Sequence, residues 1–313
     1  MAEKKILCIG LVCIDTIYEV SSYPVEDSDQ RCISQQQQRG GNASNNCSLL
    51  GILGARPHFF GTIANSRDKT FIENDFKEFG IDYSKAVTVD ESECPNSVVI
   101  ISKATGSRTI IHSNKNLREL SLSDFCQLPL EQYFWIHFEG RNISAVQEMI
   151  KHVNTLNESR ESKIKISVEI EKTLPQIFEL FPLADFVFVS KEYAQFRGWM
   201  DIQEALSNAS KLVKEGATVI CPWGDRGAGA QTGSGAMSLS PPFPPAHVVD
   251  TLGAGDTFIA STIFSICRGK SLEESVTFGC RVAGFKIGFK GWTEFRHRLL
   301  ELDFVKEMVG TRS

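Results

Sequence analysis

The sequence of 313 residues has no Cys-x-x-Cys pair, although it contains nine cysteines. A zinc site therefore lacks its usual sequence support, and the scattered cysteines do not form the spaced set of a disulfide framework. The apolar run at 6–14 is too short to cross a membrane, and no cleavage region of a signal peptide follows it. These absences favour a protein of the reducing cytosol, with no membrane partner.

The sequence also lacks an excess of positive charge and the glycine pattern of a dinucleotide-binding turn. Its formal net charge of −5 argues against a general nucleic-acid or anionic-membrane surface. A dehydrogenase of the dinucleotide-binding type needs further glycines after its first strand, but Gly10 is followed by none at 11–13. No internal repeat is present. A hydrophobic share of 42% indicates a globular protein that buries a core.

Nearly continuous apolar runs alternate with helix-like segments along most of the chain. The runs at 5–12, 135–138, 164–170, 186–189 and 218–221 are typical of strands buried on both faces, and helix-like segments lie at 144–156, 174–181 and 202–213. This alternation predicts one α/β domain over 1–313, with a doubly wound, mostly parallel central sheet flanked by helices. The spacing of apolar residues in the extension at 292–313 predicts a packed C-terminal helix.

Two segments, about 16–38 and 95–113, differ from this pattern. Residues 29–34, 97–101 and 108–111 read as strands without intervening helices, and 105–107 form a hairpin turn. We expect a small antiparallel β lid, formed from two insertions, that covers the site, forms a dimer surface, or does both.

The most informative stretch is 250–258, with the sequence DTLGAGDTF. Gly253, Ala254 and Gly255 precede an apolar helix, and the N-terminus of a helix offers unpaired N–H groups to an anion such as phosphate. Asp256 would repel a phosphate that was merely bound, so its presence there indicates proton transfer or metal contact. We take Asp256 as the candidate catalytic base of a phosphoryl transfer.

A second constellation lies at 39–46, with the sequence RGGNASNN. Asn42 and Asn45 are three residues apart and share a helical face, and their amides suit neutral hydroxyl groups. Asp15, just past the first strand, adds a carboxylate that accepts from hydroxyls. The pattern indicates a polyol site, although Gly41 and the asparagines taken alone favour a simple helix cap.

Together these two stretches resemble the two signatures of the ribokinase-like (PfkB) sugar kinases. The resemblance covers residues from about 4 to 290, with both motifs in the expected order and separation. It is closest to the fructose-phosphorylating members of the family, through 23–28, 38–45, 135–142, 188–191 and 243–250. It implies a ribokinase-like fold and transfer of phosphate from ATP, with Mg²⁺, to the 1-hydroxyl of fructose.

The resemblance also implies roles for individual residues. Asp256 is the base, and Gly253, Ala254 and Gly255 form the anion hole. Fructose is held by Asp15, Gly41, Asn42, Asn45 and Asp256, together with Asp27, which reaches over from the lid of a partner in a homodimer. The nucleotide is held by Arg108, Lys191, Gly224, Asp225, Arg226 and Gly227 and by the anion-hole residues. Cys280 lines the adenine pocket or is simply a small buried residue.

One departure from the family concerns the metal. The Asn-x-x-Glu pattern associated with magnesium is replaced by SKEY at 190–193, where Glu192 is displaced by one position. No metal ligand is therefore named, and activation by a monovalent cation is left open. Two alternatives also stay open: a related sugar or nucleoside kinase, and a non-catalytic nucleotide-binding protein on this fold.

Overall fold

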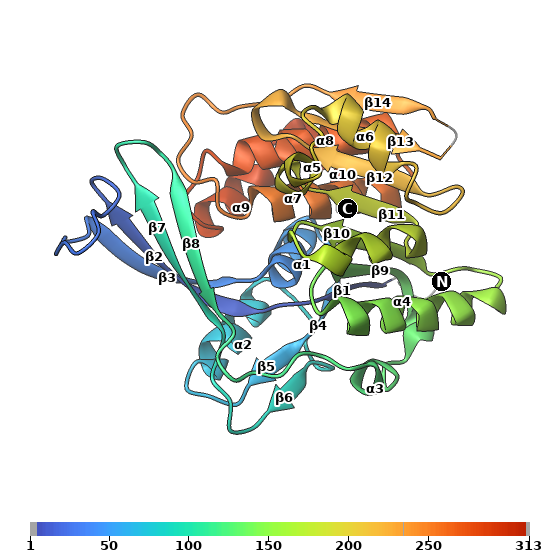
Figure 1. Cartoon of the computed structure of the whole chain (residues 1–313), viewed down its shortest axis with the longest axis horizontal. Helices are drawn as coiled ribbons and strands as arrows, with labels where there is room; N and C mark the ends of the chain where they lie inside the picture. Colours follow the sequence, from blue (N-terminus) through green and yellow to red (C-terminus); the bar gives the residue numbers. More distant parts are fainter. Residues whose placement is uncertain (1–4, 234, 311–313) are drawn as a thin grey trace.

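The structure, a computed structural model, describes residues 5–233 and 235–310 and is built around one large sheet (Figure 1). The sheet has eight strands in the order β14-β13-β12-β11-β10-β9-β1-β4, and all of them run in one direction except β13, which is antiparallel to both β12 and β14. Its strands are β1 (Lys5–Ile9), β4 (Pro57–Phe60), β9 (Tyr133–Glu139), β10 (Lys165–Ile170), β11 (Phe186–Val189), β12 (Thr218–Pro222), β13 (Ala228–Thr232) and β14 (Met237–Ser240). The predicted doubly wound, mostly parallel sheet is confirmed.

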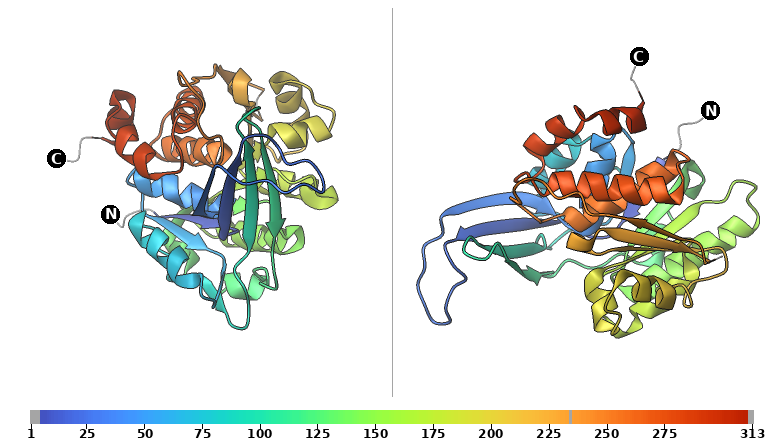
Figure 2. Two further views of the ribbon diagram at one scale, coloured as in Figure 1. Left: turned by 90° about the vertical axis from the view of Figure 1, so that its left-hand side faces the viewer. Right: turned by 90° about the horizontal axis from the view of Figure 1, so that it is seen from above.

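Helices cover both faces of this sheet, as the views in Figure 2 show. One face carries α1 (Asn42–Ile52), α2 (Lys69–Glu78), α7 (Ala254–Cys267), α8 (Leu272–Lys286), α9 (Thr293–Leu299) and α10 (Asp303–Val309). The other carries α3 (Leu122–Phe125), α4 (Ile143–Glu158), α5 (Lys191–Phe196), α6 (Ile202–Ala209) and the 3₁₀ segments η1 (Leu130–Gln132) and η2 (Pro175–Leu183). The helix expected at 174–181 is thus a 3₁₀ segment, which contains Pro182.

The alternation of side chains along β1 explains the two cores. Ile6 and Cys8 pack with the α1, α7 and α8 layer, whereas Leu7 and Ile9 pack with the α4 and η2 layer. All four side chains are buried, because successive residues of a strand point to opposite faces of the sheet. The nearly continuous apolar run in the sequence is therefore what a strand covered on both faces requires.

The lid is a separate sheet of four strands, in the order β3-β2-β7-β8, that projects from one side of the molecule (Figure 1). It consists of β2 (Cys13–Val20), β3 (Ser34–Gly40), β7 (Asn96–Ser102) and β8 (Arg108–Ser113). Its outer pairs are antiparallel, but β2 and β7 run parallel, so the expectation of an antiparallel lid is wrong for its central pair. The two central strands come from different insertions, and no hairpin fixes their relative direction.

One further expectation about strands is corrected. Residues 29–33 lie in the loop before β3 rather than in a strand. Val248 and Val249 are exposed and lie in the connection after the prolines at 241–245. A short parallel pair, β5 (Thr62–Ala64) with β6 (Val87–Val89), completes the strands.

The extension at 292–310 forms α9 and α10, which pack on the α8 side of the sheet (Figure 2). Phe295, Leu299 and Val305 are fully buried there. Residues 311–313, included in the sequence-based boundaries of this extension and of the domain, lie outside the described part of the chain.

Candidate active site

The first turn of α7 holds Asp256 in a buried position near the middle of the molecule. Its side chain is 7% exposed, and the amide nitrogen of Asn45 donates a hydrogen bond of 2.7 Å to its Oδ2 atom. Asn46 donates to the main-chain oxygen of Asp256 at 3.0 Å. Helices α1 and α7 are therefore joined at their N-terminal ends by the two motifs that the sequence singled out.

Its surroundings make Asp256 a better base than an ordinary aspartate. Burial raises its pKa to about 7, against the lowering effect of the Asn45 hydrogen bond, and the negative charges of Glu171 and Glu139 raise it further. The sequence alone does not reveal this shift of the Asp256 pKa. A carboxylate with a pKa near the working pH is suited to general base catalysis.

The turn before α7 has the geometry of an anion-binding site. Gly253 caps the helix in the left-handed region at φ 74°, and no side chain caps the first turn. A Cβ built on Gly255 would meet nothing within 4 Å, so a ligand can approach the backbone there. The N–H of Ala254 donates to Thr251 at 3.3 Å, so of the three expected donors this one already has a partner in the chain.

The residues expected to bind hydroxyls lie around the start of α1. Gly41 caps α1 at φ 98°, and a Cβ on it would lie 2.4 Å from the main-chain oxygen of Leu11, so only glycine fits. Asp15 is buried at the base of the lid on β2, and burial raises its pKa. The Oδ1 atom of Asn45 is buried and accepts no hydrogen bond from any described residue, which leaves it available to a ligand hydroxyl.

Asn42 faces two carboxylates that sequence reasoning missed. Its amide nitrogen lies 3.2 Å from each carboxylate oxygen of Glu169 and 2.9 Å from Oε2 of Glu171. A third missed carboxylate, Glu139, ends β9 and accepts from the N–H of Leu11 at 2.8 Å. All three lie at the carboxyl ends of neighbouring parallel strands, where ligands bind in such sheets, and this rule could have identified them.

The pKa values of the two glutamates at the end of β10 are shifted in opposite directions. Burial raises the pKa of Glu169 well above its usual value, and the charge of Glu171 adds to this effect. Burial also opposes ionisation of Glu171, but Lys172 outweighs it with an ion pair of 2.7 Å, so the pKa of Glu171 is lowered. Asn42 therefore contacts one carboxyl group whose pKa is raised and one whose pKa is lowered.

The expected nucleotide residues form two groups. Arg108, at the start of β8 in the lid, donates a hydrogen bond to the hydroxyl of Thr251, just before the anion-binding turn. Lys191, at the start of α5, lies 3.8 Å from Asp225, and Arg226 stacks on Trp223 at 5.0 Å. This second group surrounds η3 (Gly224–Arg226), the 3₁₀ turn after β12 that ends at Gly227.

Two predicted residues lie apart from these groups. Cys280 is buried in α8, where burial raises its pKa to about 11, as for a packed thiol. Asp27 is exposed at φ 62° in the loop between β2 and β3. This loop lies at the outer end of the lid (Figure 1). Within one subunit, Asp27 therefore does not lie beside Asp256.

The acidic donors at the site fit a magnesium ion that is shared with phosphate. No group of three or more histidine, cysteine or acidic side chains among the described residues could hold a metal by itself. Mg²⁺ usually takes one or two carboxylates together with phosphate oxygens and water, and Asp256 and Glu171 supply such carboxylates. Glu192, considered from the sequence, is exposed in the first turn of α5.

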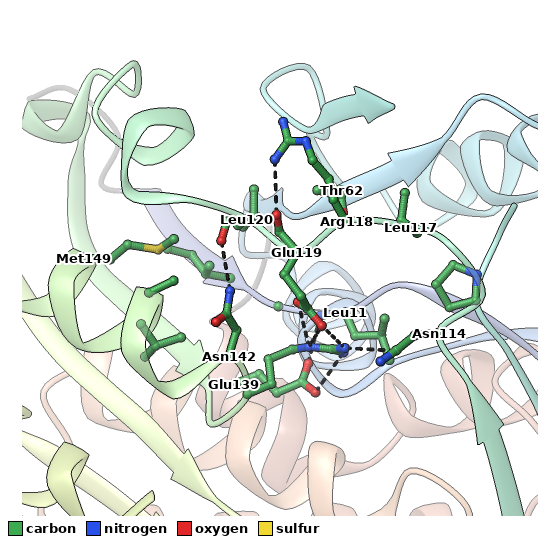
Figure 3. A pocket seen from close by; sticks show the side chains of 16 residues that line it. Leu11, Thr62, Asn114, Leu117, Arg118, Glu119, Leu120, Glu139, Asn142 and Met149 are labelled. Atoms are coloured by element: carbon green, nitrogen blue, oxygen red, sulfur yellow. Dashed lines mark hydrogen bonds and ion pairs between the residues drawn. The ribbon is translucent and has the colours of Figure 1, made fainter. Parts of the chain in front are cut away.

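A cavity adjoins Glu139, between the ends of β1 and β9, the loop at 114–120 and the start of α4 (Figure 3). Arg141 joins the walls of this cavity through its contacts. Its guanidinium donates to both carboxylate oxygens of Glu119, at 2.6 to 3.2 Å, and to Asn114 at 3.2 Å, and lies 3.6 Å from Glu139. Because 114–120 follows the last lid strand, Arg141 connects the base of the lid to the site.

No helix in the described part of the chain is long and apolar enough to span a membrane. No disulfide joins any of the nine cysteines, all of which are among the described residues.

Comparison with known proteins gives one consistent result. Residues 3–296 match the pfkB family of carbohydrate kinases. Ketohexokinase from Mus musculus is 45% identical over 93% of this chain and 99% of that protein, and ribokinase from Bacillus subtilis is 24% identical over 96% and 99%. Among solved structures, ribokinase from Giardia lamblia matches 97% of this chain and 99% of its own with a TM-score of 0.81 at 19% identity.

Proposed function

The chain belongs to the pfkB family of carbohydrate kinases, and we propose that it is a ketohexokinase that phosphorylates D-fructose at the 1-hydroxyl. The observation that carries the proposal is Asp256, a buried carboxylate with a raised pKa, held by Asn45 beside an anion-binding helix N-terminus. The similarity to mouse ketohexokinase over nearly the whole chain supports the choice of sugar. A protein that only bound a nucleotide, without transferring its phosphate, would not need such a base.

In the proposed reaction Asp256 accepts the proton of the sugar hydroxyl as the oxygen attacks the γ-phosphorus of ATP. A bond forms from O1 of fructose to phosphorus, and the bond from phosphorus to the bridging oxygen breaks, so that ADP leaves. The N-terminus of α7, with Gly253, Ala254 and Gly255, stabilises the charge on the transferring group. Asp256 and Glu171 would hold Mg²⁺ together with the phosphates, and the ion would supply neutralisation of phosphate charge.

The remaining predicted residues divide between the two substrates. Asp15, Gly41, Asn42 and Asn45 hold the sugar, and the unpartnered Oδ1 of Asn45 supports this assignment. Arg108 reaches the phosphates from the lid, since its side chain already contacts Thr251. The turn 224–227 and Lys191 lie along the nucleotide, and Cys280 borders the adenine.

We further propose a homodimer that joins through the lid and completes each site with the partner's copy of Asp27. Support comes from apolar side chains exposed on the lid: Tyr23, Val25, Ile33, Ile110 and Ile111. Mixing Asp27→Ala and Asp256→Asn subunits then regenerates one intact site in each mixed dimer, about a quarter of full activity after random exchange. Activity no higher than that of the separate variants would contradict a shared site. We place the enzyme in the cytosol.

The direct test is ADP release in the presence of Mg²⁺ with fructose, ribose, glucose and adenosine as separate acceptors. Turnover with fructose, and a product whose ³¹P signal couples to the protons on carbon 1, is the expected result. Preference for ribose or adenosine would identify a related sugar or nucleoside kinase. ATP binding without turnover on any acceptor would indicate a non-catalytic protein.

A further inference from the structure

Four side chains form a row across the lid, one from each of its strands. Asp15 on β2 is paired with Gln38 on β3 and with Ser97 on β7, and Ser97 is paired with His112 on β8. Directly paired residues point to the same face of a sheet, so Ser97 lies between Asp15 and His112. Asp15 and Ser97 are buried, at 6% and 5% exposed, whereas His112 is exposed on the edge strand. The row therefore runs from the proposed sugar site to the solvent.

The contacts of the His112 ring identify the nitrogen that carries a hydrogen. Arg141 donates to Oδ1 of Asn114 at 3.2 Å, and because arginine can only donate, this atom of Asn114 is the acceptor oxygen. The Nε2 atom of His112 lies 3.0 Å from the same oxygen, so Nε2 carries the hydrogen. In the neutral ring the Nδ1 atom is then an acceptor, and it lies 3.1 Å from the hydroxyl oxygen of Ser97.

Ser97 has one hydroxyl hydrogen and two acceptors within reach. The first is Nδ1 of neutral His112. The second is the carboxylate of Asp15: burial raises the pKa of Asp15, and the hydroxyl of Ser97 lies close enough to counteract part of this rise. While Ser97 donates to His112, Asp15 lacks this donor and keeps a weak one, the thiol of Cys13 at 3.5 Å. A buried carboxylate that is short of donors binds ligand hydroxyls well, because they replace the missing donor.

Protonation of His112 reverses the direction of the Ser97 hydroxyl. When a proton from solvent adds to Nδ1, the ring donates to the oxygen of Ser97, and the hydroxyl hydrogen turns to Asp15. The carboxylate then has a donor from the protein, and a sugar hydroxyl gains less by binding to it. The charged and titratable groups on the surrounding elements are Asp15 and Cys13 on β2, Arg39 at the end of β3, Lys115 after β8, and Arg141 with its partners Glu119 and Glu139.

We propose that Ser97 and His112 are positioning residues for the sugar, and that neutral His112 keeps the Asp15 carboxylate open to a ligand hydroxyl by drawing the Ser97 hydrogen away from it. The inference rests on the proposed function, which assigns Asp15 to the sugar. It makes the affinity for the sugar, rather than the transfer of phosphate, depend on the state of His112.

The first test is a pair of variants and their combination. His112→Leu leaves Asp15 as the acceptor for Ser97, and it raises the KM for fructose about 10-fold, the effect of roughly one hydrogen bond, while kcat stays within about twofold. Adding Ser97→Ala to His112→Leu lowers the KM again about 10-fold, because the competing hydroxyl is gone. Two losses that add in the double variant, as damage to packing would, overturn the inference.

The second test is the pH dependence of the KM. Protonation of Asp15 itself weakens binding in both proteins, so the measured quantity is the KM of the wild type divided by that of Ser97→Ala. This ratio rises from about 1 near pH 8 to about 10 near pH 5.5, because protonated His112 turns the hydroxyl toward Asp15 only where Ser97 is present. His297→Leu, at an exposed position on α9, is the control and shows the same ratio as the wild type. A ratio that does not change with pH overturns the inference, and it decides alone if His112→Leu does not fold.

A third measurement needs no sugar. In protein labelled with ¹⁵N-histidine, the ring shifts of His112 near pH 8 show the hydrogen on Nε2, whereas a hydrogen on Nδ1 overturns the inference. If fructose is not the acceptor, the KM comparisons use the acceptor that the ADP-release test identifies. A wrong sugar and a wrong role for His112 therefore give different results.

Discussion

The side-chain amide of Asn45 donates a 2.7 Å hydrogen bond to the Oδ2 atom of Asp256, across 211 positions of the sequence. This bond joins the two motifs and favours the ionised form of a carboxyl group that burial would otherwise keep protonated. The proposed base is therefore orientated by a neighbour that itself belongs to the proposed sugar site. In the proposed reaction, binding of the sugar and proton transfer to Asp256 are therefore coupled through the side chain of Asn45.

Replacing Asn45 by leucine should move the pH dependence of catalysis. Loss of a hydrogen bond to a charged group costs about 1.5–3 kcal/mol, which raises the pKa of Asp256 by about one to two units. The acidic limb of kcat/KM, expected near pH 7 in the wild type, should shift upward by that amount, with kcat reduced even at high pH because the carboxylate is no longer orientated. An unchanged limb would show that another group titrates.

Asp256→Asn should abolish the acidic limb of the pH profile of kcat/KM and lower kcat by about 10²- to 10⁴-fold. The folded-state pKa of Asp256 lies above its value in an unfolded chain, so the wild type loses stability as the pH rises from about 4 to about 7. The asparagine variant lacks this loss and should melt no lower than the wild type at pH 8. Its circular dichroism melting curve therefore separates lost chemistry from lost folding.

Glu169→Gln tests the charge of the residue beside Asn42. The pKa of Glu169 is raised well above its usual value, so the folded protein favours the neutral form and loses stability as the pH rises above about 4.5, the value in an unfolded chain. Glutamine resembles the neutral form, and the variant should lose less stability than the wild type between pH 5 and pH 9. Glu161→Gln, at an exposed position, is the control and should follow the wild type. A variant that melts lower than the wild type throughout this range would show that Glu169 is ionised.

Arg141→Met tests the connection between the loop that follows the lid and Glu139. It removes the bonds to Glu119 and leaves the buried Glu139 without its nearby cation, at a cost of roughly 3 kcal/mol. Glu119→Gln should cost far less, because that carboxylate is partly exposed. We also expect a higher KM for fructose in Arg141→Met. Equal melting temperatures for the two variants would show that Glu139 does not depend on Arg141.

The sequence predicted those parts of the molecule that depend on local pattern. Buried strands such as 186–189 and the turn at 253–255 were found from their own residues, because apolar runs and glycines act locally. The pairing of β2 with β7 was missed, since strands from separate insertions carry no local signal of direction. The raised pKa of Asp256 could not be predicted for a similar reason: it arises mainly from burial, with a further contribution from the charges of Glu171 and Glu139, and all of these depend on residues remote in sequence.

Lys286 shows the same limit more clearly. In the sequence it is one lysine at the end of an amphipathic helix, where a cation is expected simply because it stabilises the helix C-terminus. Only the folded chain brings it to the oxygens of Asp250 and Leu252. Lys286 can be recognised as a partner of the motif at 250–258 only when the turn at 250–252 and the end of α8 are placed next to each other.

Arg108→Ala should weaken the use of ATP while leaving the fold intact. The side chain is exposed and extends from the lid to Thr251, so its removal leaves no buried group without a partner. Loss of a charged hydrogen bond to phosphate costs about 1.5–3 kcal/mol, or roughly a 10- to 100-fold fall in kcat/KM for ATP. Arg108→Lys should recover only part of this, because lysine lacks the planar fork of arginine. Lys103→Ala, at an exposed position near the same lid turn, is the control and should keep the wild-type kcat/KM for ATP. An equal fall in kcat/KM in that variant would show that the net charge of the lid, rather than Arg108, attracts the nucleotide.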